Sequence, residues 1–414
     1  MTYTQQITVN IRKLSAVKSL NDQILSGKRA GCSDFCVHIA GEQTYANICA
    51  PIAGVLAYYR SQGLNIQVIY DPPQSYARQT RFDAPAEAED LIEHSSMSNP
   101  FDKVWRFRTS EEINALVNAF ILSVRQADII KPGVISSLEW CLNETMDNVL
   151  QHSQAECGYL MGQLHKNHSR LSMCIFDSGI GIYNSLKGSR HSPPAPLDAI
   201  TLALQEKVTR DEKVGQGNGL WGLSRLISDS HGTIRISSGG AVYCKNQDGE
   251  ISTVKDGEFN LGRENGTTLV DFQMDYSQEI DITRILNGYQ PVDLWLENIE
   301  ADNGDAVISI ATQSHGTGTR RAAEKMRTMA LNLTLSDKKR VVFDFSGVNL
   351  ISSSYSDELV GKIISRYGFS FFINHFAIIN LSPTNASILN RSVQQRMAQA
   401  YYDETMNETD EDEQ

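Results

Sequence analysis

The sequence lacks the features of a membrane, secreted or nucleic-acid-binding protein. No apolar run approaches the roughly 18 residues that a spanning helix needs. The N-terminus has neither the basic start nor the apolar stretch of a signal peptide. Lys and Arg (37) are fewer than Asp and Glu (49), and no basic stretch suggests a face for nucleic acid. We therefore expect a cytoplasmic protein with no membrane or nucleic-acid partner.

Cysteine patterns for metal or disulfide chemistry are also missing. The chain has seven cysteines, an odd number, and none forms a C-x-x-C pair. Several lie in apolar runs, as Cys174 does within 171–176. Buried reduced thiols are the expectation, rather than zinc ligands or disulfides.

A length of 414 residues predicts two to four domains. The pattern of apolar runs and helix or turn signals predicts an α/β protein. We expect an N-terminal α/β unit and linker over 1–127, a central domain over 128–280 and a C-terminal α/β domain over 295–402. Within the first unit, strands are expected at 34–39 and 65–70 and an amphipathic helix at 47–62. Residues 403–414, rich in acidic side chains, are expected to be a disordered tail.

The central domain contains a helical segment with polar residues on one face. Glu144, Asn148 and His152 are four residues apart, so successive members lie about 40° apart around the helix. An asparagine oxygen suits Mg²⁺, and a glutamate one turn away can polarise a water molecule. The same pattern also fits an ordinary solvated helix face.

An apolar strand over 171–176 leads into Asp177, followed by Gly179 and Gly181. A carboxylate at a strand end can accept a hydrogen bond from an exocyclic amine such as that of adenine. The glycines allow the backbone to turn close to a planar base. An ordinary strand-ending turn has the same composition.

Four glycines, Gly215, Gly217, Gly219 and Gly222, precede a helical run. Backbone N–H groups before a helix favour phosphate binding, although a mobile linker has similar glycine content. The last three fit a dinucleotide fingerprint, but the charged residues 209–213 upstream exclude the buried strand that this fingerprint requires. Arg210, Lys213 and Arg225 are alternative phosphate contacts.

Together, these segments resemble the GHKL ATPases, a superfamily that includes gyrase, heat-shock chaperones and histidine kinases. Glu144, Asn148 and His152 resemble the N box, the turn at 177–181 the first glycine box, and 215–222 the ATP lid. Residues 266–272 are similar to the late Gly-Thr strand. The resemblance implies an α/β sandwich with a mixed sheet that binds ATP and Mg²⁺. It implies that Glu144 is the catalytic base, that Asn148 holds Mg²⁺, that Asp177 reads adenine and that Thr267 supports Asp177.

The C-terminal segment resembles the STAS-like domains that accompany such ATPases. A strand over 341–345 leads into a turn containing Ser352 and Ser353, the candidate phospho-acceptors. The sequence departs from the anti-sigma-antagonist pattern at Ile351, where an aspartate normally stands. Alternatively, Ser354 and Asp357 form a helix cap and the other serines satisfy backbone groups.

These patterns favour an ATP-driven switch in which Mg-ATP closes the lid, a surface for self-association or for a partner forms, and hydrolysis resets it. By analogy, the partners are a second copy of the chain in a homodimer, or a protein bound through the STAS-like domain. The alternative is a serine kinase of the anti-sigma-factor type, acting on a STAS-like serine in the same chain or in a partner. A third hypothesis is a nucleotide sensor without turnover. A sensor histidine kinase is disfavoured because His94 lacks the usual surrounding pattern.

Overall fold

A computed structural model describes most of the chain. The residues that it leaves out are 1–3, 14, 74, 94–98, 190, 206–218, 256, 258–259, 262–265, 287–295, 297–298, 315 and 412–414. Contacts divide the chain into two compact units. The first contains Met1–Ile121 and Ser136–Gln290, and the second contains Leu122–Ile135 and Pro291–Gln414. The expected domains 1–127 and 128–280 therefore belong largely to one unit, and each unit is described here by itself.

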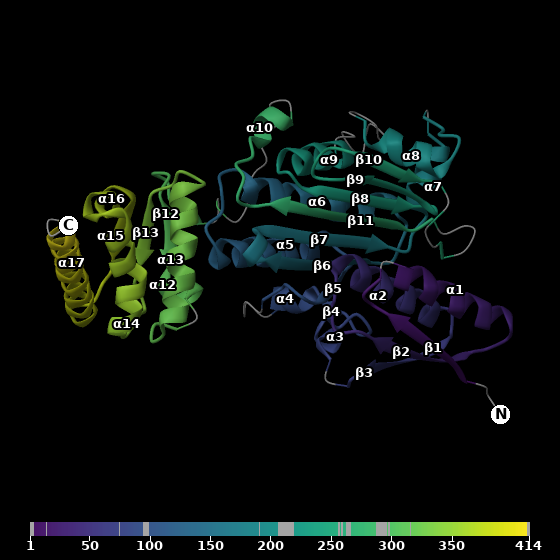
Figure 1. Cartoon of the computed structure of the whole chain (residues 1–414), viewed down its shortest axis with the longest axis horizontal. Helices are drawn as coiled ribbons and strands as arrows, with labels where there is room; N and C mark the ends of the chain where they lie inside the picture. Colours follow the sequence, from purple (N-terminus) through teal and green to yellow (C-terminus); the bar gives the residue numbers. More distant parts are fainter. Residues whose placement is uncertain are drawn as a thin grey trace. The chain divides into compact units, whose positions relative to one another are not determined.

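The first unit is built around an eight-stranded sheet (Figure 1). Its strand order is β10-β9-β8-β11-β7-β6-β5-β4, and its pairs are antiparallel except β4 with β5. The strands are β4 (Ala86–Glu87), β5 (Val104–Phe107), β6 (Gly158–His165), β7 (Arg170–Asp177), β8 (Thr233–Ser238), β9 (Ala241–Lys245), β10 (Ile251–Val254) and β11 (Thr268–Asp275). The prediction of an α/β protein with a mixed sheet is confirmed.

Alternation along the central strands assigns helices to opposite faces of this sheet. On β6, Gly162 lies against Phe120 of α5 (Ser110–Ala127), where an added Cβ would approach the ring to 2.5 Å. Tyr159, three residues earlier on β6, points to the opposite face, where it lies against Gly54 of α2 (Ala46–Ser61). On the α5 side, α6 (Val134–His152) and α9 (Gly219–Asp229) also pack together, with Gly222 against Trp140.

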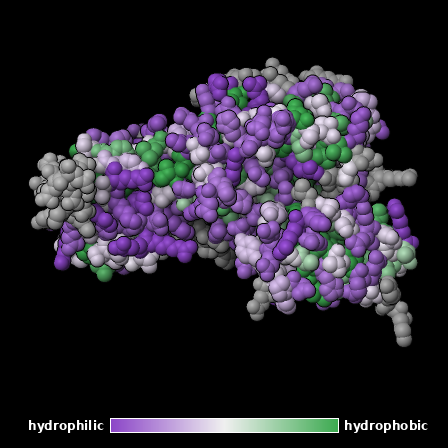
Figure 2. Space-filling view, viewed as in Figure 1, coloured by the Kyte–Doolittle hydropathy of each residue, from purple (hydrophilic) through white to green (hydrophobic). Residues whose placement is uncertain are grey.

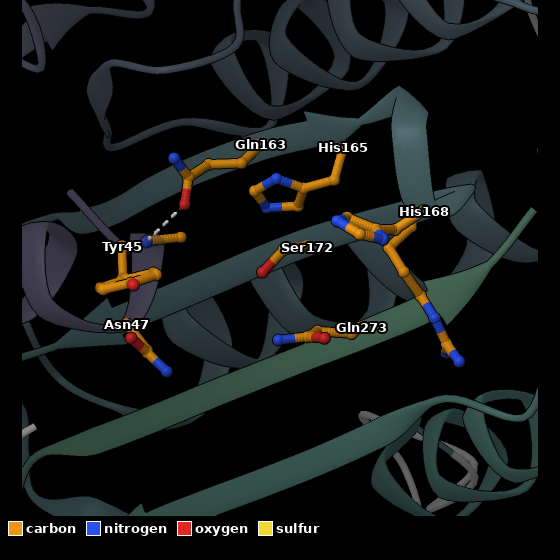
Figure 3. Close-up of a pocket in the computed structure, with 9 residues that line it drawn as sticks. Tyr45, Asn47, Gln163, His165, His168, Ser172 and Gln273 are labelled. Atoms are coloured by element: carbon orange, nitrogen blue, oxygen red, sulfur yellow. Dashed lines mark hydrogen bonds between the residues drawn. The ribbon is translucent and has the colours of Figure 1, made fainter. Parts of the chain in front are cut away.

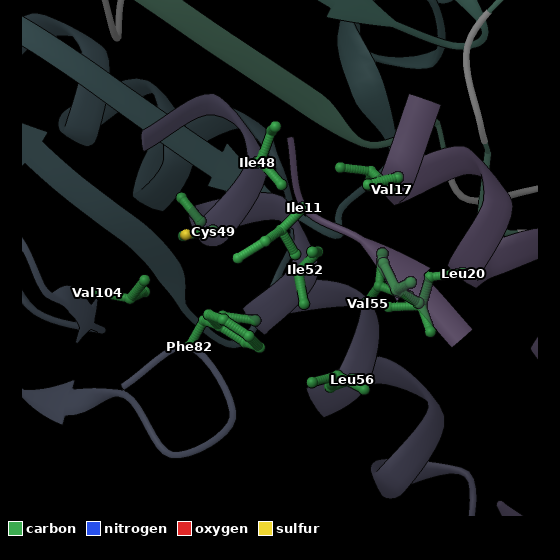
Figure 4. Close-up of a cluster of buried hydrophobic side chains, with 14 of the residues drawn as sticks. Ile11, Val17, Leu20, Ile48, Cys49, Ile52, Val55, Leu56, Phe82 and Val104 are labelled. Atoms are coloured by element: carbon green, nitrogen blue, oxygen red, sulfur yellow. The ribbon is translucent and has the colours of Figure 1, made fainter. Parts of the chain in front are cut away.

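A second, three-stranded sheet lies on the other side of α2. It consists of the parallel strands β1 (Thr4–Asn10), β2 (Asp34–Ala40) and β3 (Asn65–Asp71), flanked by α1 (Ser15–Arg29). Helix α2 is buried on nearly all sides because it contributes to the core shared with both sheets (Figure 4). The expectation that 47–62 is amphipathic is therefore wrong, since an amphipathic helix keeps one face in water.

The second unit has a three-stranded parallel sheet in the order β12-β13-β14. Its elements are β12 (Ala306–Ser309), α12 (Ile310–Gln313), α13 (Arg320–Leu335), β13 (Val341–Asp344), α14 (Ser353–Ser356), a π-helical turn (Asp357–Gly361), α15 (Lys362–Tyr367), α16 (Phe369–His375), β14 (Phe376–Ile379) and α17 (Pro383–Glu411). Helix α17 extends into the segment 403–414 that was expected to be disordered. Its Ala, Gln, Met and Glu residues have high helix propensity.

Several elements were not predicted, among them β1, α1, β6, β9, β10 and α13. The polar stretch 74–100, expected to be a linker or weak helix, contains α3 (Tyr76–Gln79), β4 and α4 (Glu89–Glu93). Short elements of this kind are selected by tertiary pairing, because local propensity alone is too weak to specify them.

No helix in the described part of the chain is long and apolar enough to cross a bilayer. The face seen in Figure 2 is mainly hydrophilic, with hydrophobic side chains in small patches. All seven cysteines lie within the described residues as free thiols, and four of them are buried, namely Cys36, Cys49, Cys141 and Cys174.

A buried asparagine ties the segment 122–135 to α13 within the second unit. The Asn332 side chain accepts a hydrogen bond from the Ile130 N–H (2.8 Å). Its amide donates to the carbonyl oxygens of Arg125 and Asp128, both at 2.8 Å. Asn332 is fully buried, so no water can replace these bonds.

We predict that Asn332→Ala lowers the free energy of opening of α13 by about 3 kcal/mol, because three buried backbone groups lose their partner. Hydrogen exchange of the α13 amides, followed by mass spectrometry, measures this free energy. Asn374→Ala is the control, since Asn374 is exposed on α16. Equal protection in both variants would contradict the structural role of Asn332.

Candidate functional site

Helix α6 presents Glu144 and Asn148 on one partly buried face. Burial, together with the negative charge of the neighbouring Asp147, raises the pKa of Glu144. Burial also raises the pKa of Asp147. A carboxylate in this environment retains a proton more readily than one in water, which brings its basicity nearer to that needed at neutral pH.

The start of α9 lies directly against these two side chains. A Cβ added at Gly219 would lie 2.8 Å from Glu144 Oε2 and 3.2 Å from Asn148 Nδ2. A side chain at position 219 would therefore displace the Glu144 carboxylate and crowd the Asn148 amide. The structure thus brings Glu144 and Asn148 together with the first residue of a helix whose N-terminus carries partial positive charge.

Asp177 ends β7 as a buried carboxyl group with 3% of its surface exposed. Its Oδ1 accepts a hydrogen bond from the Gly179 N–H at 2.8 Å. Burial raises the pKa of Asp177 to about 7, although hydrogen bonds from Gly179 and from the Thr268 side chain act in the opposite direction. The group therefore changes protonation near neutral pH unless a ligand stabilises its charge.

The threonine that contacts Asp177 is Thr268, and the expected role of Thr267 needs correction. Thr268 pairs with Asp177 across β11 and β7, so the two side chains share one face of the sheet. Thr267 instead contributes backbone atoms. Its N–H donates to the Gly179 carbonyl at 3.1 Å, and its own carbonyl accepts from the Ser238 hydroxyl at 2.8 Å.

The glycine turn packs against the backbone before β11. Gly181 has a φ of +74°, which favours glycine, and an added Cβ would lie 2.7 Å from the carbonyl group of Gly266. Gly266 in turn lies against the Ile180 carbonyl, where an added Cβ would come within 2.3 Å. Side chains at either glycine would separate the two segments that flank Asp177.

Ser153, directly after α6, connects this turn to the Glu144 and Asn148 face. The Ser153 carbonyl accepts a hydrogen bond from the Ile180 N–H at 2.8 Å. Asn148 is five residues earlier, or about 8 Å along the helix axis at 1.5 Å per residue. Helix α6 thus links the turn after Asp177 to the segment that carries Glu144 and Asn148. Neither Ser153 nor Thr268 was predicted, because both contacts join segments distant in sequence.

Gly179 is expected to be the least tolerant glycine of this turn. An added Cβ would lie 2.1 Å from the Ser153 carbonyl oxygen, a backbone atom that cannot move without shifting α6. We predict that Gly179→Ala destabilises the first unit by about 2 kcal/mol or more. Gly188→Ala is the matched control, because no atom lies within 4 Å of its added Cβ. Urea unfolding compares the variants, and equal midpoints would contradict the predicted clash.

Two of the four lid glycines fall within the described part of the chain. Gly219 lies at Glu144, and Gly222 lies against the Trp140 ring. Gly215 and Gly217 lie outside the described residues, as do Arg210, Lys213 and His94. Arg225 is exposed on α9, with its guanidinium carbon 5.3 Å from the Trp221 ring centroid. Since only Arg225 of the three predicted phosphate contacts is described, the choice among Arg210, Lys213 and Arg225 stays open.

The polar groups of this face offer few metal ligands of their own. Among the residues that the structure describes, no group of three or more His, Cys, Asp or Glu side chains could hold a metal ion. Asn148 offers one amide oxygen beside Glu144, and Mg²⁺ commonly takes one or two protein ligands with phosphates and water.

In the second unit, the serine turn caps α14 two residues earlier than expected. The Ser352 hydroxyl accepts a hydrogen bond from the Tyr355 N–H at 3.0 Å, so Ser352 is the N-cap rather than Ser354. Asp357 is not part of the cap, because its carboxylate pairs with the Arg396 guanidinium through two bonds of 2.8 Å. Ser353 is exposed, and its hydroxyl makes no hydrogen bond with the described residues.

Comparison with known proteins identifies part of the second unit. Residues 322–386 match the STAS-like domain of unknown function (DUF4325), which supports the predicted STAS-like domain at the C-terminus. This match runs from α13 into the start of α17 and includes the serine turn. No curated protein sequence matches the chain.

Proposed function

We propose that this chain is an ATP-binding, ATP-hydrolysing regulatory protein of the GHKL type. The observation that carries the proposal is the contact of Gly219, at the start of α9, with Glu144 and Asn148 of α6. Two segments about 70 residues apart in sequence, both expected at the nucleotide phosphates, meet at one place.

In this proposal, Asp177 receives the adenine amine. A buried carboxylate with its second hydrogen bond supplied by Thr268 discriminates strongly for a donor, because an unpaired buried charge is costly. The glycines at 179 and 181 let this turn pack directly against the backbone of Ser153 and Gly266, which fixes the position of Asp177.

Glu144 acts as the general base that accepts a proton from the attacking water. Its raised pKa suits this task near neutral pH. Asn148 supplies an oxygen to Mg²⁺, which when bound neutralises charge on the phosphates. The N-terminus of α9 contributes N–H donors and partial positive charge on the same side.

The regulatory part of the proposal is a switch. Phosphates that contact the start of α9 would hold the lid segment closed, and product release would free it. The surface formed on closure would bind a second copy of the chain or a protein partner. The STAS-like domain is the second docking module, since domains of this type engage in protein interactions.

A serine kinase is the second candidate, favoured by one observation. Ser353 is exposed at the first turn of α14, and its hydroxyl is not used by the cap that occupies Ser352. Ser353 is therefore the accessible phospho-acceptor of the two predicted.

One experiment separates the candidates. Wild-type protein, Glu144→Gln and Ser353→Ala are incubated with γ-labelled Mg-ATP, and free phosphate and protein-bound label are measured together. Free phosphate without protein-bound label, lost in Glu144→Gln, supports the ATPase. Label that disappears in Ser353→Ala supports the kinase. Absence of ATP binding in the wild type would overturn both.

A further inference from the structure

A cavity of about 290 Å³ lies on the sheet face opposite to Asp177 (Figure 3). Its floor is a row of polar residues across three neighbouring strands, Gln163 on β6, Ser172 on β7 and Gln273 on β11. Strand alternation places this row on the face covered by α2, whereas Asp177 points to the other face. The cavity is therefore distinct from the proposed nucleotide site.

Ser172 is a largely buried residue whose hydroxyl opens onto the cavity and has no partner among the described residues. The residue is 6% exposed, and its oxygen points into the cavity in Figure 3. A hydroxyl that opens onto a cavity takes its hydrogen-bond partner from water or from a ligand. The neighbouring Gln163 is fully engaged, accepting from the Ala46 N–H (3.1 Å) and donating to Thr44 and Asp102 (both 3.2 Å). Ser172 is thus the hydroxyl available to a ligand.

The roof of the cavity is the start of α2, a 16-residue helix without a side-chain cap. The Gln163 side chain accepts from the Ala46 N–H, and the Tyr45 carbonyl accepts from the Ile48 and Cys49 N–H groups. The positive end of the helix dipole still faces the cavity. Asn47 lines the same wall, and its amide donates to the Asp271 carboxylate at 3.0 Å. The partial positive charge of a helix start in a polar cavity favours an anion.

Basic side chains line the remaining wall. His165 and His168 are exposed beside the cavity, and Arg170 lies at the start of β7. The Arg170 guanidinium is held by the His231 carbonyl (2.6 Å) and the Gln247 side chain (3.2 Å), which fixes its charge at the rim. Asp275, 4.0 Å from Arg170, offsets part of this charge.

We propose that this cavity binds a small organic anion, with a carboxylate or phosphate group between the start of α2 and Arg170. The Ser172 hydroxyl donates to the ligand, and the amide of Gln273 contacts its polar remainder. The volume lies at the lower end of small-molecule sites, which is the size for a metabolite rather than a nucleotide. This site is independent of the proposed ATPase activity.

The test is NMR of the histidine ring signals of the full chain, with sodium phosphate and sodium acetate as probes and sodium chloride at equal ionic strength as reference. Signals of His165 and His168, assigned with His165→Gln and His168→Gln, should shift with at least one probe and not with chloride. A response to phosphate alone or acetate alone identifies the preferred charged group. Equal shifts in all three salts would overturn the proposal.

Variants locate the binding. Ser172→Val should weaken the binding of the active probe at least tenfold, because a methyl group replaces the hydroxyl. Ser237→Val is the matched control, a buried serine of β8 outside the cavity, and should bind as wild type does. Gln273→Leu provides a second test if Ser172→Val does not fold. Asp177→Asn should leave the probe affinity unchanged, which separates this site from the nucleotide site. Unchanged affinity in both cavity variants would refute the assignment.

Discussion

Glu144→Gln should reduce ATP hydrolysis by at least about 100-fold while leaving ATP affinity within about threefold. The loss of a general base costs roughly 10²–10⁴ in rate. Glutamine keeps the shape and the contact with the start of α9 but cannot accept the proton of the attacking water. Steady-state phosphate release and equilibrium nucleotide binding measure the two quantities separately.

Asp147→Asn is the matched control for this prediction. Asp147 lies three residues after Glu144 on the same helix and is half-buried. Its negative charge helps to raise the pKa of Glu144. Removing that charge lowers the pKa of Glu144, which makes it a weaker base but leaves it in place. We expect a reduction in rate of less than about tenfold. Equal losses in Glu144→Gln and Asp147→Asn would argue against Glu144 as the base.

Asp177→Asn should weaken ATP binding by about 10- to 100-fold, the usual cost of losing a hydrogen bond to a charged group. Asparagine can still accept from the Gly179 N–H through its Oδ1. Its amide then faces the adenine amine, so a donor opposes a donor. Calorimetric titration with ATP measures the change. GTP, which lacks this amine, should bind both proteins weakly, and a wild-type affinity for ATP in the variant would contradict the role of Asp177.

The same substitution should stabilise the protein without ligand at alkaline pH. Burial raises the pKa of Asp177 to about 7, whereas the ordinary value of 3.8 applies to an unfolded chain. Between these values the folded state binds more protons than the unfolded state, so wild-type stability falls as pH rises from about 4 to 7. Asparagine removes this dependence. The gain in melting temperature of Asp177→Asn over wild type should therefore grow from pH 5 to pH 8.

Asp271→Asn separates the stability effect from the binding effect. Burial raises the pKa of Asp271 to about 6, and Asn47 donates a hydrogen bond to it on the opposite sheet face. This variant should also gain stability at alkaline pH, over a window ending near pH 6. Because Asp271 does not face the proposed nucleotide site, ATP affinity should stay unchanged. Reduced ATP affinity in Asp271→Asn would mean that the two faces of the sheet are coupled.

Much of the proposed site is encoded locally. The four-residue spacing of Glu144 and Asn148 places both on one face of α6 wherever the helix lies. The apolar run before Asp177 requires a buried strand with the carboxyl group at its end. These features depend on helix and strand periodicity, which the order of side chains along the chain already contains.

Tertiary structure decided what depends on register and on partners distant in sequence. Pairing of β11 with β7 assigned Thr268, rather than Thr267, to Asp177, because a shift of one residue reverses the face of a side chain. Helix α2 proved to be buried on nearly all sides because a second sheet covers it, which no local pattern could indicate. The cavity at Ser172 likewise exists only where three strands and the start of α2 meet. Sequence determined the type of each polar residue and its place on an element, while packing between elements determined which residues meet.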